Sequence, residues 1–175
     1  MANTTLGIYP VFDNKFMIGI NGIDSVGTTR ATPNDMREVS CLESFSVSFD
    51  NGVEEFKPLE EKGWTRRMLT GKSFSITLNG KRDVGNEGND YLAGMVFKTG
   101  RAATTKFEWM MVDGTLVKCD CVVNVTAVGG DSTNIEALEV EFLSEGKPEI
   151  IPAETAKSTY GTNPDGSIQY PPVEA

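Results

Sequence analysis

Hydrophobic and polar residues alternate with a period of two along several segments of the chain. Residues 42–49 read Leu-Glu-Ser-Phe-Ser-Val-Ser-Phe, which places Phe45, Val47 and Phe49 on one side and serines on the other. Successive side chains of a β-strand point to opposite faces of the sheet, so this pattern predicts a half-buried antiparallel strand with one polar face. The same alternation occurs in residues 73–79, 105–112, 117–126 and 137–143.

Glycine-containing turns separate the later predicted strands. Asp113-Gly114 lies between residues 105–112 and 117–126 and predicts a hairpin. Gly129-Gly130-Asp131 predicts the turn between the last two strands. The sequence therefore indicates a mostly β fold with an antiparallel sheet.

One segment has helical spacing. Its apolar residues stand at i, i+1, i+4 and i+5, and we expect this stripe to pack across the apolar face of the sheet. An asparagine, Asn86 or Asn89, is placed to cap its start, and Gly100 to end it. The apolar residues of the stripe are Tyr91, Leu92, Met95 and Val96.

Three segments lack clear alternation. Residues 1–40 contain one short candidate strand, formed by Phe16, Met17, Ile18 and Ile20. Residues 50–72 form a long connection between two strands, and connections of this length are usually functional or mobile. Residues 148–175 are rich in Pro, Ser, Thr and Gly, which predicts a flexible extension. We therefore expect one domain over residues 1–147, followed by that extension.

Composition excludes several function classes. The chain has 175 residues, which is enough for one domain with a sizeable core. Its 25 acidic and 16 basic residues give a formal charge of -9, which disfavours binding of nucleic acid by neutralisation of phosphates. The absence of histidine removes the commonest general base and metal ligand, and every Ser-His or Cys-His arrangement. We expect a protein that is not an enzyme and has no cofactor.

The cysteines favour burial over metal binding or disulfides. Three cysteines form no regular framework for a disulfide-stabilised domain. Cys119 and Cys121 share the apolar phase of a predicted strand, and only Cys41 remains as a third ligand for zinc, so we interpret them as buried thiols. The N-terminus does not resemble a signal peptide, and no apolar run approaches the roughly 18 residues of a membrane span. These features indicate a soluble protein of a reducing cytoplasm.

The connection over residues 50–72 contains a candidate interface. It includes Trp64-Thr65-Arg66-Arg67, and Trp and Arg are the residues most enriched at protein interfaces. An arginine pair in an acidic protein also favours contact with another copy of the chain. The alternative is a surface loop with one anchoring tryptophan. The candidate interface residues are Lys62, Trp64, Arg66 and Arg67.

The polar faces of the predicted strands have an unusual composition. They consist of Ser, Thr, Asn and Glu, and Lys106 and Lys118 are the exceptions. Such a surface suits something charged that must pass along it without adhering. An ordinary solvated sheet fits the composition equally well. Glu139 and Glu141 lie on one such face, where a solvated strand is a better interpretation than a glycosidase pair, which needs one carboxyl with a raised pKa.

The order and texture of these segments resemble a known family. The segment Gly63-Trp64-Thr65-Arg66-Arg67-Met68-Leu69-Thr70-Gly71-Lys72 and the closing strand, residues 137–142, carry most of the likeness. The closing strand leads into Glu145-Gly146-Lys147-Pro148. Over residues 1–150 the chain resembles the major tail protein, or tail tube protein, of long-tailed bacteriophages that infect Gram-positive bacteria.

This resemblance implies a fold and a function. It implies an antiparallel β-sandwich or small barrel with one flanking helix, assembled into hexameric rings that stack into a tube in the virion after synthesis in the host cytoplasm. Phage DNA would pass through the lumen without sequence-specific binding, and residues 1–40 would become ordered on assembly. The implied partners are the tape-measure protein, the tail terminator and the distal tail or baseplate proteins. The expected lumen-facing residues are Ser44, Ser46, Ser48, Ser75, Thr77, Glu139 and Glu141.

Other functions remain open at this level. A β-sandwich binding module for carbohydrate or a cell surface would show aromatic residues on an exposed strand face, whereas the strand aromatics here lie in the apolar phase. The inner tube of a contractile injection device shares every feature named above. An enzyme would have to work with carboxylates alone.

Overall fold

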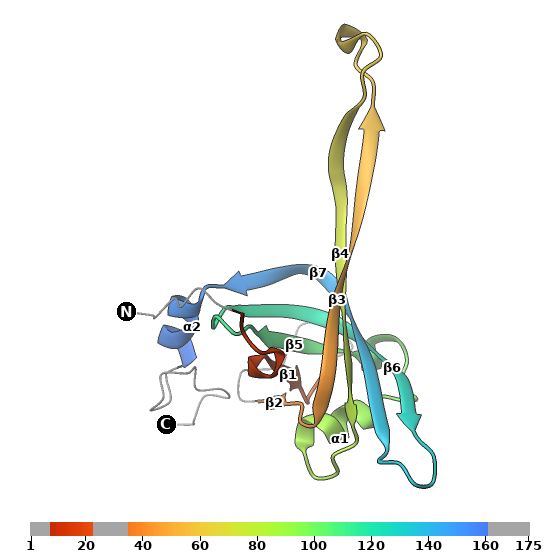
Figure 1. Cartoon of the computed structure of the whole chain (residues 1–175), viewed down its shortest axis with the longest axis vertical. Coiled ribbons are helices and arrows are strands. Elements are labelled where there is room, and N and C mark those ends of the chain that lie inside the picture. The colour runs from red at the N-terminus through yellow and green to blue at the C-terminus, as the bar shows by residue number, and fades with distance from the viewer. Residues whose placement is uncertain (1–7, 23–34, 161–175) are drawn as a thin grey trace.

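The computed structural model describes residues 8–22 and 35–160. Its strands form one seven-stranded sheet in the order β2-β1-β5-β6-β7-β4-β3, and all neighbouring strands are antiparallel (Figure 1). The strands are β1 (Lys15–Gly19), β2 (Met36–Glu38), β3 (Leu42–Phe56), β4 (Arg66–Lys81), β5 (Thr104–Met110), β6 (Leu116–Gly129) and β7 (Ala137–Ile151). The helices are α1 (Glu87–Ala93) and α2 (Ala153–Tyr160), with short 3-10 turns η1 (Val11–Asp13), η3 (Leu59–Glu61) and η4 (Gly100–Ala103).

The sheet curls until its two ends meet. The end strands β2 and β3 are consecutive in the chain and are joined by residues 39–41 alone. Across this junction the Phe16 ring lies 4.9 Å from the Phe45 ring, and Phe45 lies 5.8 Å from Trp109. The mostly β, antiparallel fold with a flanking helix is confirmed, and the sheet has the form of a small open barrel.

Backbone contacts fix the short junction. Val39 donates its N–H to Phe16 O at 3.0 Å, and Lys81 donates to Cys41 O at 2.9 Å. Cys41 has a left-handed φ of 57°, which turns the chain into β3. At Gly80 a Cβ would lie 2.5 Å from Cys41 O, so only glycine allows β4 to approach this closely.

The main core occupies the concave side of the sheet. The predicted apolar faces of the strands meet there, together with Leu92 and Met95 from the α1 region. The Phe107 and Phe142 rings stack at 4.5 Å near its centre. Phe49 differs from the prediction: its side chain is 62% exposed, because β3 leaves the body of the protein at this residue.

A second, smaller core covers the other side of β1 and β5. It consists of Met17, Met36, Met110, Leu116 and Ala156, so β5 is buried on both faces. Ala156 belongs to α2, where the sequence predicted a flexible extension. β7 pairs with β6 as far as Ile151, and α2 follows directly after Pro152, so regular structure ends later than predicted. Residues 161–175 of the predicted extension lie outside the described residues.

Helix α1 begins at one of the two expected capping residues and ends earlier than expected. Asn86 is the N-cap and accepts the N–H of Asn89 at 2.8 Å. Asn89 is buried and accepts from Arg82 Nη1 at 2.8 Å while donating to Lys81 O at 2.9 Å, so it anchors the helix to the end of β4. The hydrogen bond from Arg82 to Asp90 lowers the pKa of that carboxyl. The helix ends at Ala93, before Gly100, and Val96 lies outside it and is exposed.

The contact between α1 and β2 leads to a first prediction. A Cβ at Gly88 would lie 2.6 Å from Glu38 O, so Gly88→Ala should lower the free energy of unfolding by about 1–3 kcal/mol. Alanine stabilises a helix by about 1 kcal/mol relative to glycine when there is no steric conflict. A loss of stability in Gly88→Ala would therefore indicate the steric contact with Glu38. Urea unfolding measures it, with Gly130→Ala as control because its nearest atom lies 3.6 Å away. A Gly88→Ala protein as stable as the wild type would contradict this packing.

The buried cysteines lead to a second prediction. Burial raises the pKa of Cys119 to about 12 and that of Cys121 well above its ordinary value, whereas Cys41 is exposed. Because only the thiolate reacts with a disulfide reagent, the native protein at pH 8 should titrate one thiol and the unfolded protein three. Cys41→Ser should remove the fast-reacting thiol. Rapid reaction of a second thiol in the native state would contradict the assignment.

Candidate functional site

The residues expected to face a lumen all lie on one face of the sheet, which we call the hydroxyl face. It comprises Ser44, Ser46 and Ser48 on β3, Ser75 and Thr77 on β4, and Glu139 and Glu141 on β7. The strand register places them in rows that run across the sheet. One row is Ser46, Thr77 and Glu141, and another is Ser44, Asn79 and Glu139. The prediction that these residues line a lumen is not tested by this placement, but the predicted shared face is present.

The hydroxyl face continues onto β6 with residues that were not predicted. Asn124 stands opposite Glu141 in the register and donates Nδ2–H to its Oε2 at 3.3 Å. Thr126 donates its hydroxyl to Glu139 O at 3.2 Å, and Asn79 Nδ2 donates to Ser44 Oγ at 3.3 Å. The alternation in residues 117–126 already held the signal for Asn124 and Thr126, since both fall in its polar phase.

Two rows of this face, Ser44-Asn79-Glu139 and Ser46-Thr77-Glu141, contain carboxylates and no Lys or Arg. The next row is mixed, because Lys81 of β4 stands opposite Ala137 and lies 3.7 Å from Glu43 of β3. Toward β5 the same side of the sheet becomes mixed. Lys118 lies 3.6 Å from Glu108, whose carboxylate is buried, and Lys106 stands opposite Asp120 in the register. The two exceptional lysines of the polar faces therefore stand opposite acidic partners.

The predicted residues of the face carry hydroxyl and carboxylate groups on an open sheet. Within the described ranges, no group of three or more potential metal ligands gathers. Among these residues, none of the helices is long and apolar enough to cross a membrane. The geometry suits a surface that holds water and repels anions.

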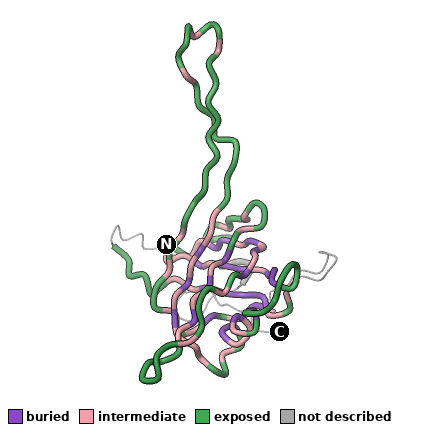
Figure 2. Tube along the Cα trace, turned by 90° about the vertical axis from the view of Figure 1, so that its right-hand side faces the viewer, coloured by how far each residue is buried: buried purple, intermediate pink, exposed green. Residues whose placement is uncertain are grey.

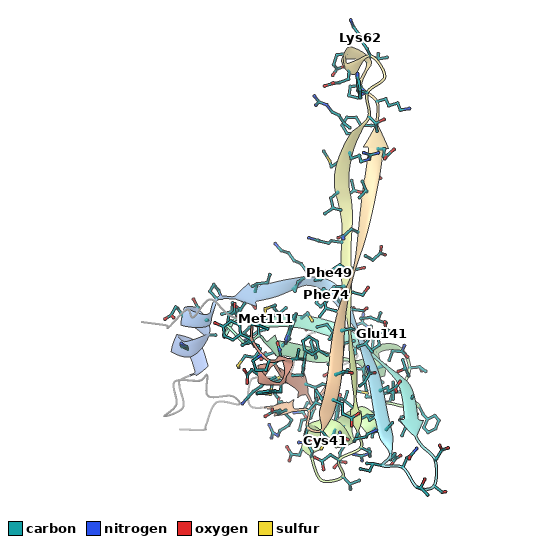
Figure 3. The ribbon with its side chains drawn as sticks, viewed as in Figure 1. Cys41, Phe49, Lys62, Phe74, Met111 and Glu141 are labelled. Carbon is teal, nitrogen blue, oxygen red and sulfur yellow. The ribbon has the colours of Figure 1, made fainter. Side chains whose placement is uncertain are left out.

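The connection over residues 50–72 forms an arm, which is a β-hairpin and not an irregular loop. β3 and β4 stay paired from Leu42 to Phe56 and from Arg66 to Lys81, and their distal half projects far from the body (Figure 1). Phe49 and Phe74, with rings 6.2 Å apart, lie where the arm leaves the body (Figure 3). Figure 2 shows exposed residues along nearly the whole arm. No core lies against either face, so the sequence shows no alternation there.

The predicted interface residues all lie at or near the tip of the arm. Trp64 is 77% exposed, and Lys62 ends η3 in a left-handed conformation. Arg66 and Arg67 are neighbours on β4 and therefore point to opposite faces, so they form no single basic patch. Each is paired within the arm: Arg66 with Glu61, and Arg67 with Glu55 at 2.5 Å.

The arm also exposes apolar residues that the sequence interpretation did not include. Leu59 at the tip is 96% exposed. Further down, Val53 faces Leu69 on one side of the ribbon, and Met68 lies on the other side with Phe56. The sequence did contain an indication of this surface, since the arm carries large apolar residues although neither of its faces is buried. The arm holds five acidic and five basic residues, so it is neutral within a chain of charge -9.

Comparisons with known proteins identify related folds. No protein-family model and no curated protein matches the sequence. Among solved structures, the chain is similar to one from the tail of an empty gene transfer agent (GTA) particle, refined with helical C6 symmetry. The TM-score is 0.60 at 17% identity, covering 82% of this chain and 99% of that one. A chain from the virion of the native GTA particle gives 0.57 at 16% identity, again with 82% and 99% covered. At such identities the likeness establishes a shared fold.

Proposed function

We propose that this chain is a structural, non-enzymatic subunit of a phage-type tail, which assembles into stacked rings with the hydroxyl face toward a central channel. The observation that carries the proposal is the hydroxyl face itself. Two of its rows, Ser44-Asn79-Glu139 and Ser46-Thr77-Glu141, cross β3, β4 and β7 without a basic residue, and the second continues to Asn124 on β6. This face occurs on a fold shared with chains of tail particles.

Two open strand edges support ring formation. β3 pairs with β4 alone in the described structure, and residues 123–129 of β6 pair with β7 but extend beyond their pairing with β5. Unpaired edges invite pairing with another chain. The strands β3, β4, β7 and β6 alternate in direction, so the two outer strands, β3 and β6, run in opposite directions. If copies are related by rotation about the channel, β6 of one copy and β3 of the next would therefore also be antiparallel. Repetition of this contact closes a continuous barrel, and the C6 symmetry of the similar tail favours six copies.

The channel would serve as a conduit for DNA. Carboxylates of Glu139 and Glu141 repel phosphates at close range even in physiological salt, and hydroxyls keep the wall hydrated. The resemblance to tail tube proteins supports virion localisation and partners of the tape-measure, terminator and distal tail or baseplate classes. The inner tube of a contractile device remains the nearest alternative, because the same face would serve it.

The arm would join successive rings. Its exposed apolar residues have no partner in the described body, and exposed clusters of this kind mark interaction surfaces. Trp64 and Lys62 at the tip retain their predicted interface role. Arg66 and Arg67 would contribute as ion pairs that stiffen the tip as well as through direct contact.

The edge contact leads to a third prediction. Phe74 donates its N–H to Ser144 Oγ on β7, so its amide points away from β3. Phe74 faces Phe49 in the register, and opposing antiparallel residues exchange either both hydrogen bonds or none. The Phe49 N–H therefore points to the open edge. Phe49→Pro should fold but form no rings or tubes in negative-stain electron microscopy, since proline is tolerated at such an edge and cannot donate.

Phe49→Ala is the matched control for this experiment. It removes the same exposed ring and keeps the N–H, so it should still assemble, as should the concentrated wild-type protein. Assembly of Phe49→Pro to normal tubes would rule out this edge as a ring contact. A wild-type protein that stays dispersed under all conditions would argue against the proposed function itself.

The orientation of the hydroxyl face gives a fourth prediction. In a Cys41→Ser background, Ser46→Cys should react with a bulky polymer-linked maleimide as a dispersed subunit and be protected in tubes, because the reagent cannot enter a narrow channel. Phe97 follows α1 and is 96% exposed, so Phe97→Cys should react both as a dispersed subunit and in tubes. The reverse pattern would show that the α1 side faces the channel.

A further inference from the structure

A groove lies beside the start of β3, where the two ends of the sheet meet. Its volume is about 570 Å³, and its walls come from η1, β1, the junction over residues 39–41 and the first residues of β3. The lining includes Phe12, Phe45, Glu38, Glu43 and Cys41. Volumes of this order hold a small-molecule ligand, so one or two large side chains fit as well.

The groove is apolar on one wall and charged at its rim. Phe12 is 83% exposed and Val11 is 61% exposed, and both line it beside the half-buried Phe45. The rim holds the exposed Glu38 and Glu43 together with Lys15, and Glu43 lies 3.7 Å from Lys81. No salt bridge is found for Glu38 among the described residues, so a matching partner would bring large apolar side chains and a cation for this carboxylate.

The tip of the arm, residues 57–65, has this chemistry. Leu59 and Trp64 are 96% and 77% exposed there. Glu61 is neutralised by Arg66, whereas no salt bridge is found for Lys57 or Lys62 among the described residues. The tip thus presents two large apolar side chains, the ammonium groups of Lys57 and Lys62 and the carboxylate of Glu60, in a chain whose overall charge is -9.

The groove and the tip lie at opposite ends of the molecule. Figure 3 shows Lys62 at one end of the long axis and Cys41 near the other. β3 alone spans 15 residues between them, which is about 50 Å at roughly 3.3 Å per residue. The tip cannot reach the groove of its own chain. A second copy displaced along the long axis brings its tip to this groove, and the contact then repeats without closing.

We propose that the groove of each copy receives the arm tip of another copy, with Trp64 and Leu59 against Phe12 and Phe45 and Lys62 beside Glu38 and Glu43. This inference rests on the proposed function and deepens it, because it names the surface that the arm meets on the next ring. The groove itself is built by the junction, since η1, β1 and β3 come together only there.

A disulfide between Cys41 and an engineered tip cysteine tests the contact. Glu60→Cys adds one thiol at an exposed tip position outside the proposed contacts, and Cys119 and Cys121 are buried, so Cys41 is the accessible native partner. Mild oxidation of assembled Glu60→Cys protein should give a ladder of covalent multimers on non-reducing gels, because each copy carries one tip thiol and one groove thiol. Reductant should collapse the ladder to monomer.

Two controls separate the alternatives. Glu60→Cys with Cys41→Ser should give no ladder, and cross-linking that persists there as dimers would show contact between two tips. Phe97→Cys with native Cys41 should also give no ladder. Tubes without a ladder in Glu60→Cys would overturn this inference and leave the proposed function intact. A ladder without rings or tubes would support the contact and reject the function, and the absence of both would reject the two together.

Complementation gives an independent readout. Trp64→Ala removes the tip anchor and Phe12→Glu places a carboxylate in the groove, and both residues are exposed, so the subunits should fold. Loss of a buried tryptophan anchor typically weakens binding by about 30-fold or more, so each variant alone should form rings that do not stack. When rings of the two variants are mixed, they should form pairs of rings. The intact tips of the Phe12→Glu ring can enter the intact grooves of the Trp64→Ala ring, and no further ring can be added. Tubes of normal length from either variant alone would contradict the assignment.

Discussion

The structure depends on the short junction that joins the two ends of its sheet. Only residues 39–41 separate β2 from β3, so the sheet must curl until Phe16 and Phe45 touch. The left-handed Cys41 and the missing side chain of Gly80 make this closure sterically feasible. The same junction sets the direction in which the long β3–β4 hairpin leaves the body. The core, the arm and the groove are therefore consequences of one local constraint.

Curling separates two surfaces with opposite requirements. The concave side excludes water and holds the aromatic residues, which stack at 4.5 Å between Phe107 and Phe142. The hydroxyl face is the other side of the same strands, and its residues are exposed or half-buried. Lysines on this side stand opposite Glu108 and Asp120 in the register near β5. The rows of Glu139 and Glu141 contain no basic residue, whereas Lys81 at the end of β4 lies 3.7 Å from Glu43. Carboxylates without a cation in their row repel a polyanion.

Sequence periodicity predicted the structure where one face of a strand is buried and the other is wet. The strands at residues 73–79 and 137–143, and the shared face of Ser46, Thr77 and Glu141, follow from it directly. It was uninformative for the arm, which is wet on both faces, and incomplete for β5, which α2 covers on its second face. The groove could not be predicted, because η1, β1 and β3 approach one another only through the closure of the sheet.

The exposed features of the subunit favour assembly over an isolated existence. An unprotected edge on β3 and large apolar residues on the arm are aggregation hazards in a lone protein, and natural sheets normally blunt such edges. Both features become buried if copies pair edge to edge and tip to groove. The edge contact closes into a ring, whereas the tip-to-groove contact joins opposite ends of the molecule and has no geometric end point. A tube built this way contains no information about its own length, so a separate component must set it.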